Sequence, residues 1–225
     1  EASLAAASIL KQGGNAFDAA VGAVFVSMTS EFSLTGPFGG GACVGMENNN
    51  SPFVYDFFVD CPVNLANQKE FKEVSVNFGK TTQKFHIGKG SIAVPGNIAG
   101  LLEIQKNHGV LAIDKVLVHA IDYAHNGVTI NQYQAYIMNL IKPILTFEQN
   151  DLFIRNGSLM KEGDLFKNVS FSSFLKMLLD RGCEYFYNGS GLNDIIGFLG
   201  NQSCLSKNDF INYRVHKREP ISLEF

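Results

Sequence analysis

Side chains able to do chemistry are scattered along the 225 residues, and none of them falls into a recognised catalytic motif. The sequence contains no GxSxG elbow and no HExxH helix, and Gly88-Lys89-Gly90-Ser91 lacks the spacing of a phosphate-binding loop. His119 and His125 lie six positions apart on a predicted helix, where they point to different faces and make a poor metal pair. We therefore expect neither a catalytic residue nor a metal or cofactor site in this chain.

Composition and charge narrow the class of protein. With 46% hydrophobic and 17% charged residues, the chain has the profile of a folded globular domain. Its formal net charge of −3 gives no electrostatic reason for a nucleic-acid or acidic-membrane partner. No apolar run is long enough to span a bilayer, and no basic segment precedes the first predicted helix. Without a visible signal peptide we expect a cytoplasmic location, with a periplasmic or extracellular one open if the N-terminus is truncated.

Two further groups of residues carry weak signals. Residues 214–218 contain the densest basic cluster, followed at once by an acidic residue, and we expect a solvated strand or loop face. The four cysteines are widely spaced and include no CxxC pair, so they indicate neither a disulfide scaffold nor a zinc site. They are Cys43, Cys61, Cys183 and Cys204.

The glycine-rich run 36–41 is a segment whose composition suggests a special backbone. A dinucleotide-binding loop needs its glycines between a strand and a helix, whereas this run follows a predicted helix and precedes predicted strands. Two interpretations stay open: a tight turn in which side chains would clash, or a backbone wall beside a site. We expect at least one of Gly39, Gly40 and Gly41 to adopt a positive φ.

Periodicity and turn residues predict an α+β chain with an excess of helix. The helix after Asn15 is apolar nearly all round from Ala19 to Met28, and we expect this surface to need a partner. The chain alone should then be poorly soluble and inactive. Residues 65–90 are expected to form an excursion with poorly defined structure. The other predicted elements are helices at 2–12, 98–108, 116–124, 131–141, 171–181 and 192–199, and strands at 42–46 and 53–59 joined by a turn at 48–51.

Short motifs follow one another along nearly the whole chain, and each is weak by itself. In order they are Gly13-Gly14-Asn15-Ala16, Gly36-Pro37-Phe38-Gly39-Gly40-Gly41, Asp56-Phe57 before Pro62, Ala93-Val94-Pro95-Gly96, Asn126-Gly127, Phe186-Tyr187-Asn188-Gly189, Asp209-Phe210-Ile211-Asn212-Tyr213 and Arg218-Glu219-Pro220. The ordered series resembles the γ-glutamyltransferase family of N-terminal-nucleophile (Ntn) hydrolases. The resemblance places residues 1–225 in the large-subunit region of that family, as a single domain that a partner chain completes.

The resemblance implies a four-layer αββα Ntn-hydrolase fold, made as a proenzyme that cuts itself into two chains. This chain would supply packing helices, some strands and one wall of the pocket, in which we place Gly39, Gly40 and Gly41. The implied partner is a small subunit whose N-terminal Thr is the nucleophile, with its own α-amino group as base. The implied substrate is a small-molecule amide or peptide, and the heterodimers could assemble further.

Position 58 departs from the family pattern. Family members typically read Asp-Phe-Arg-Glu, and that Arg holds the α-carboxylate of the γ-glutamyl group; here the chain reads Asp56-Phe57-Phe58-Val59. If Phe58 takes the substrate-binding place of the arginine, the resemblance implies a substrate other than a γ-glutamyl compound. Alternatively, Phe58 is a core residue and an Arg of the partner chain holds the carboxylate.

Two functions stay open on these grounds. The chain belongs either to a self-processing amide hydrolase or acyltransferase, or to a non-catalytic homologue that keeps the fold as a structural or binding subunit. The N-terminal residue of the partner chain distinguishes them, because only a nucleophile there supports catalysis.

Overall fold

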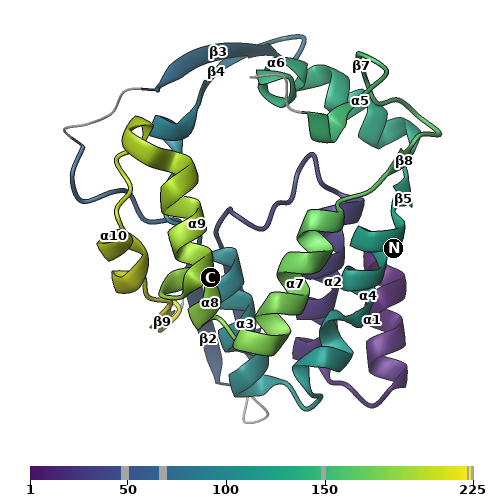
Figure 1. The fold of residues 1–225 in the computed structure, drawn as a ribbon. Coiled ribbons are helices and arrows are strands. Elements are labelled where there is room, and N and C mark those ends of the chain that lie inside the picture. The colour runs from purple at the N-terminus through teal and green to yellow at the C-terminus, as the bar shows by residue number, and fades with distance from the viewer. Residues whose placement is uncertain (47–50, 66–69, 148–150, 222, 224–225) are drawn as a thin grey trace.

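The computed structural model describes residues 1–46, 51–65, 70–147, 151–221 and 223. Helices pack around one face of a small antiparallel sheet, and two further segments extend from this body at the same end of the molecule (Figure 1). This is the α+β architecture with excess helix that the sequence predicts. Among the described residues, no helix combines the length and the apolar character needed to cross a membrane.

The chain begins with a helical hairpin. Helix α1 (Ala2–Lys11) ends before Gly13, which turns the chain with a φ of 91°. Asn15 then caps α2 (Ala16–Ser30) as predicted, because its side chain accepts hydrogen bonds from the backbone N–H groups of Phe17 and Asp18.

Helix α2 lies inside this chain. Helices α1, α3 (Asn97–His108) and α4 (Ile113–Asn126) pack against it, and Val21, Phe25 and Val26 are almost completely buried. The expectation that α2 needs a partner chain to cover it is therefore wrong. The apolar character of α2 all round reflects helices of the same chain on several sides.

The central sheet has the strand order β1–β2–β9, all antiparallel. Strand β1 (Gly41–Met46) and strand β2 (Pro52–Phe57) form the predicted hairpin, although β2 ends two residues earlier than expected. Most of the predicted turn at 48–51 lies outside the described residues. Strand β9 (His216–Arg218) is exposed at every residue, which confirms the solvated strand expected for the basic cluster.

The two faces of this sheet differ. Phe53, Tyr55 and Phe57 of β2 point into the main core, among the helices. On β1, Val44 and Met46 keep 73% and 59% of their surface exposed. The sheet therefore has one face covered by helices of this chain and one face that this chain leaves open, where Val44 and Met46 share the surface with the ion pair of Asp56 and Arg218.

The remaining predicted helices are present. The stripe expected at 171–181 is α7 (Val169–Arg181), which buries Phe171, Leu175 and Leu178 and stops before Gly182 at a φ of 70°. The C-terminal third adds α8 (Glu184–Tyr187), α9 (Ser190–Leu199) and the short α10 (Lys207–Asn212). Short 3₁₀ turns occur at Lys89–Ser91, Asp151–Phe153 and Gly200–Gln202.

The excursion at 65–90 contains a regular hairpin, so the expectation of poorly defined structure is wrong. Strand β3 (Lys72–Asn77) pairs with β4 (Thr82–Ile87). Asn77 accepts a hydrogen bond from the backbone N–H of Gly79, whose φ is 87°. These strands were missed because most of their side chains are exposed and the apolar alternation is short, with Val74 and Val76 on β3 and Phe85 and Ile87 on β4.

Residues 128–166 enclose a second, smaller hydrophobic cluster. Its members come mainly from the turns and short elements of this segment. The ammonium group of Lys72 on β3 lies 5.6 Å from the ring centroid of Phe147, a residue of the same segment. The elements are β5 (Val128–Thr129), α5 (Gln132–Leu140), α6 (Lys142–Leu145), β6 (Ile154–Arg155), β7 (Ser158–Leu159) and β8 (Leu165–Phe166). That residues 1–225 form a single domain stays a prediction.

Candidate functional site

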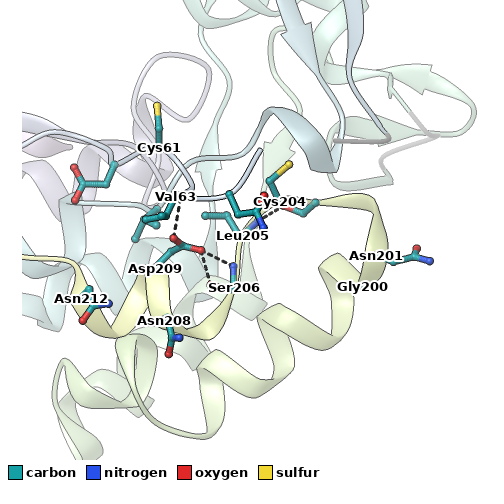
Figure 2. A pocket seen from close by; sticks show the side chains of 14 residues that line it. Cys61, Val63, Gly200, Asn201, Cys204, Leu205, Ser206, Asn208, Asp209 and Asn212 are labelled. Atoms are coloured by element: carbon teal, nitrogen blue, oxygen red, sulfur yellow. Dashed lines mark hydrogen bonds between the residues drawn. The ribbon is translucent and has the colours of Figure 1, made fainter. Parts of the chain in front are cut away.

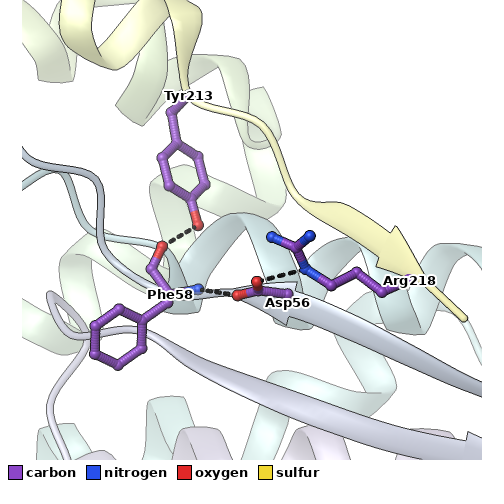
Figure 3. A network of polar contacts seen from close by, with 4 residues as sticks. All are labelled: Asp56, Phe58, Tyr213 and Arg218. Atoms are coloured by element: carbon purple, nitrogen blue, oxygen red, sulfur yellow. Dashed lines mark hydrogen bonds and ion pairs between the residues drawn. The ribbon is translucent and has the colours of Figure 1, made fainter. Parts of the chain in front are cut away.

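Phe58 follows directly on the last residue of β2. Its side chain is 66% exposed, so within this chain it is not a core residue. Its backbone is held on both sides: the N–H donates to Oδ1 of Asp56 at 3.1 Å, and the carbonyl accepts from the hydroxyl of Tyr213 at 2.9 Å. Figure 3 shows the phenyl ring pointing away from these polar contacts. The structure thus fixes the backbone at residue 58 and leaves its ring outside the core.

Asp56 joins β2 to the edge strand β9. Its Oδ2 accepts from Nε of Arg218 at 2.8 Å (Figure 3). The pKa of Asp56 lies below its usual range, first because the Phe58 N–H bonds to the carboxylate and second because Arg218 does. The guanidinium of Arg218, which lies beside this strand end, is therefore already paired with a carboxylate of its own chain.

The glycine loop lies against the same strand end. None of Gly39, Gly40 and Gly41 has a positive φ, so that expectation is wrong. A glycine is required at position 40 for another reason: a Cβ there would lie 2.6 Å from the backbone N of Val59 and 2.7 Å from the carbonyl O of Phe57. The requirement is a close approach of two backbones, which any side chain would prevent.

The start of α3 holds this loop in place. The carbonyl of Gly39 accepts hydrogen bonds from the N–H groups of Gly96 and Asn97, both at 2.9 Å. The Asn97 side chain donates to the carbonyl of Gly36 at 2.7 Å. The predicted loop residues and Phe58 are therefore brought together, because Gly40 contacts the strand end on which Phe58 sits. That this surface is a wall of a substrate pocket stays a prediction.

Glycines at the start of α3 bring that helix onto β2. A Cβ at Gly96 would lie 1.8 Å from the carbonyl O of Phe57 and 2.2 Å from the Tyr213 hydroxyl. A Cβ at Gly100 would lie 2.1 Å from Cγ of Phe57. The Pro-Gly motif before α3 is thus explained by packing against the strand that carries residue 58.

Sequence reasoning missed the tyrosines that surround this junction. Tyr187 donates its hydroxyl to the carbonyl of Pro95 at 2.6 Å, and its ring stacks on that of Tyr213 with centroids 5.5 Å apart. Burial is the main reason that the pKa values of both phenols are raised. Both hydroxyls therefore stay protonated donors. The sequence marked these tyrosines only by their positions in the family-like motifs 186–189 and 209–213. A tyrosine in a sequence does not reveal to which carbonyl its hydroxyl will donate.

A pocket of about 820 Å³ opens beside the segment that follows Phe58. Figure 2 shows Cys61 and Val63 on one side and the region of α10 on the other. Asp209 joins the two sides: its carboxylate accepts from the N–H of Val63 at 3.0 Å and from the N–H and hydroxyl of Ser206 at 2.7 and 2.6 Å. Burial by itself would raise the pKa of Asp209, but these hydrogen bonds outweigh burial and the pKa is lowered.

Across the described ranges, no group of three or more His, Cys, Asp or Glu side chains is placed to hold a metal ion. The cysteines are unpaired thiols. Burial, followed by the charges of Glu184 and Glu103, raises the pKa of Cys183 to about 12, so its thiol is a poor nucleophile.

Comparison with known proteins shows that this chain matches a known family. The family model described as gamma-glutamyltranspeptidase matches residues 2–225. Glutathione hydrolase 2 of Arabidopsis thaliana is 27% identical over 220 residues, covering 96% of this chain. The capsule biosynthesis protein CapD proenzyme of Bacillus anthracis is 27% identical over 213 residues, covering 95% of this chain.

Solved structures share the fold. The crystal structure of Helicobacter pylori gamma-glutamyltranspeptidase superimposes with a TM-score of 0.82 at 26% identity, covering 98% of this chain and 63% of that one. The chain spans 37% of the Arabidopsis protein and 36% of the Bacillus protein. It therefore takes the fold expected for the helix-rich large-subunit portion of an Ntn hydrolase, and it belongs to the gamma-glutamyltranspeptidase family.

Proposed function

We propose that this chain is the large-subunit part of a self-processing Ntn amide hydrolase or acyltransferase whose substrate presents an uncharged or apolar acyl group. The observation that carries the proposal is the exposed phenyl ring of Phe58 at the end of β2. The ring stands where the family resemblance expects an arginine, and the strand end beneath it contacts Gly40 of the loop.

The chemistry of the two side chains differs sharply. A guanidinium binds a carboxylate through two parallel charge-assisted hydrogen bonds, each contributing about 1.5–3 kcal/mol. A phenyl ring offers none, and a carboxylate buried against it without a partner loses several kcal/mol. Arg218 is a weak substitute, because its Nε is bonded to Asp56 and the carboxylate offsets its charge. Free γ-glutamyl compounds are therefore expected to bind poorly.

A small subunit completes the site in this proposal. The open face of the sheet, with Val44 and Met46 largely exposed, is the surface on which a second sheet of an αββα fold would pack. Covering each of these side chains would contribute about 1.5–3 kcal/mol. The names of the Bacillus relative and of other relatives contain the word proenzyme, which supports self-cleavage into two chains. We place the nucleophilic Thr at the new N-terminus of the small subunit, with its α-amino group as base.

Steady-state kinetics of the complete protein tests the substrate proposal. Two anilides of equal length are compared, one with a γ-glutamyl group and one with an uncharged straight-chain acyl group. We expect kcat/KM to favour the uncharged anilide by at least about tenfold, which corresponds to about 1.4 kcal/mol. Efficient turnover of the γ-glutamyl anilide by the unmodified protein would overturn the proposal.

A matched pair of variants sharpens the result. Phe58→Arg restores the family residue and should raise kcat/KM for the γ-glutamyl anilide by about 10- to 100-fold. Phe198→Arg makes the same change at a 70% exposed phenylalanine on α9 and should leave it unchanged. Equal responses of the two variants would mean that added charge, rather than position 58, determines the outcome.

A further inference from the structure

Two residues of the motif Asp209–Tyr213 stand one helical turn apart at α10. Asp209 lies in the first turn of the helix and Tyr213 caps its C-terminal end, so their side chains can reach the same neighbouring segment. Both are nearly buried, with 9% and 5% of their surface exposed. Neither has a role in the function proposed above.

Both side chains bond to the backbone of the segment that follows β2. The Tyr213 hydroxyl donates to the carbonyl of Phe58 at 2.9 Å (Figure 3), and the Asp209 carboxylate accepts from the N–H of Val63 at 3.0 Å (Figure 2). Between these points, Asp60 and Val94 exchange two backbone hydrogen bonds at 3.2 and 2.8 Å. Residues 58–63 are therefore tied down at both ends and in the middle.

The Tyr213 hydroxyl has little freedom to move. It lies in the space that a side chain at Gly96 would fill, since a Cβ there would come within 2.2 Å of it. The ring is stacked on Tyr187, whose own hydroxyl bonds to Pro95. The phenol is thus held by packing on one side and by its acceptor on the other.

We propose that α10 is a positioning clamp, in which Tyr213 and Asp209 fix the segment 58–63 and so set the place of the Phe58 ring in the substrate site. This inference rests on the proposed function, because it assigns the clamp to the site at residue 58. Tyr213 acts through Phe58 and does not itself touch the substrate. The spacing of the Asp209–Tyr213 motif follows from the need to reach both ends of one segment.

The test uses Tyr213→Phe in the complete protein, which removes only the hydroxyl. We expect KM for the uncharged anilide to rise at least about fivefold, the equivalent of one lost hydrogen bond, while kcat changes less than about twofold. The matched control is Tyr55→Phe, which removes a buried hydroxyl that bonds to His108 and Asn107 on the helix-covered face. It should lower the melting temperature to a similar extent and leave KM unchanged.

A second comparison asks whether Tyr213 acts through residue 58. In a Phe58→Ala background, Tyr213→Phe should raise KM no further, because the ring that it positions is absent. An equal rise in both backgrounds, an unchanged KM in the single variant, or an equal rise in Tyr55→Phe would overturn the clamp. If Tyr213→Phe fails to fold, Asp209→Asn replaces it, with the same expected pattern and the same contradicting outcomes.

Amide hydrogen exchange separates this inference from the proposed function. The amides of residues 58–60 should exchange at least about fivefold faster in Tyr213→Phe than in the wild type or in Tyr55→Phe. If the wild-type protein hydrolyses neither anilide, the proposed function fails while faster exchange still supports the clamp. Unchanged exchange at 58–60 overturns the clamp whether or not the protein is active.

Discussion

Replacing Asp18 by asparagine would remove the charge from a carboxylate that is completely buried at the start of α2. Its Oδ2 accepts from the backbone N–H groups of Asn15, Val110 and Leu111 at 3.1, 2.9 and 3.3 Å, and its Oδ1 accepts from the Gln105 side chain at 3.3 Å. The carboxylate thus caps α2 and ties it to the loop after α3.

The magnitude follows from the donors that lose their acceptor. Asparagine keeps one oxygen but places an NH₂ group where three backbone N–H groups or the Gln105 amide now point. In the better orientation the asparagine oxygen still faces the three backbone N–H groups, so only the Gln105 amide loses its acceptor, and a buried donor left unpaired costs about 1–3 kcal/mol. We expect Asp18→Asn to lower the free energy of unfolding by about 1–3 kcal/mol, a sizeable share of the 5–15 kcal/mol typical of a domain.

Urea unfolding of the complete protein at pH 7, followed by circular dichroism, measures this loss. The control is Asp122→Asn on α4, whose carboxylate bonds, among the residues that the structure describes, only to the exposed side chain of Asn126, and this change should cost within about 0.5 kcal/mol. A loss below about 1 kcal/mol for Asp18→Asn would refute the reasoning, because it would mean that the buried donors find other partners.

At pH 8, iodoacetamide should modify the exposed Cys61 at least about a hundredfold faster than Cys183, whose pKa is raised to about 12; equal rates by peptide mass spectrometry would contradict this. The folded-state pKa of Asp209 is lowered, so its contribution to stability is present above its unfolded pKa of about 3.9 and is lost as the pH falls through the folded value. The difference in unfolding free energy between wild type and Asp209→Asn should therefore shrink between pH 5 and pH 2, and a constant difference in urea titrations would count against it. Val44→Lys with Met46→Lys should release the small subunit in size-exclusion chromatography, whereas intact heterodimers would show that the open sheet face is not the interface.

Local signals in the sequence predicted most of the helices and the central hairpin. Asn15 and the Gly127 that follows α4 mark helix ends by mechanisms that act within a few residues, so they could be read directly. The strands β3 and β4 were missed because most of their side chains are exposed and only two apolar residues on each strand alternate with polar ones. The sequence showed that the apolar surface of α2 must be covered, but it did not reveal that helices of the same chain cover it, because that depends on tertiary packing.

The candidate site was predictable only in part. The motif order pointed to Phe58 and the glycine loop, and the structure brings them together at Gly40. The expectation of a positive φ was wrong, whereas the interpretation that side chains would clash in this run is confirmed at Gly40. Asp209 and Tyr213 contact a segment that lies about 150 positions earlier in the sequence; Tyr213 and Phe58, for example, are 155 positions apart. No local sequence pattern encodes contacts over such a distance.

Our central proposal is that this chain is the large-subunit part of a self-processing enzyme whose nucleophile lies in a second chain. N-terminal sequencing of the fragments of the purified complete protein tests it most directly. We predict two chains, the smaller of which begins with Thr. A single uncleaved chain, or a small chain that begins with a residue that is not a nucleophile, would contradict the account and favour a non-catalytic homologue that keeps the fold.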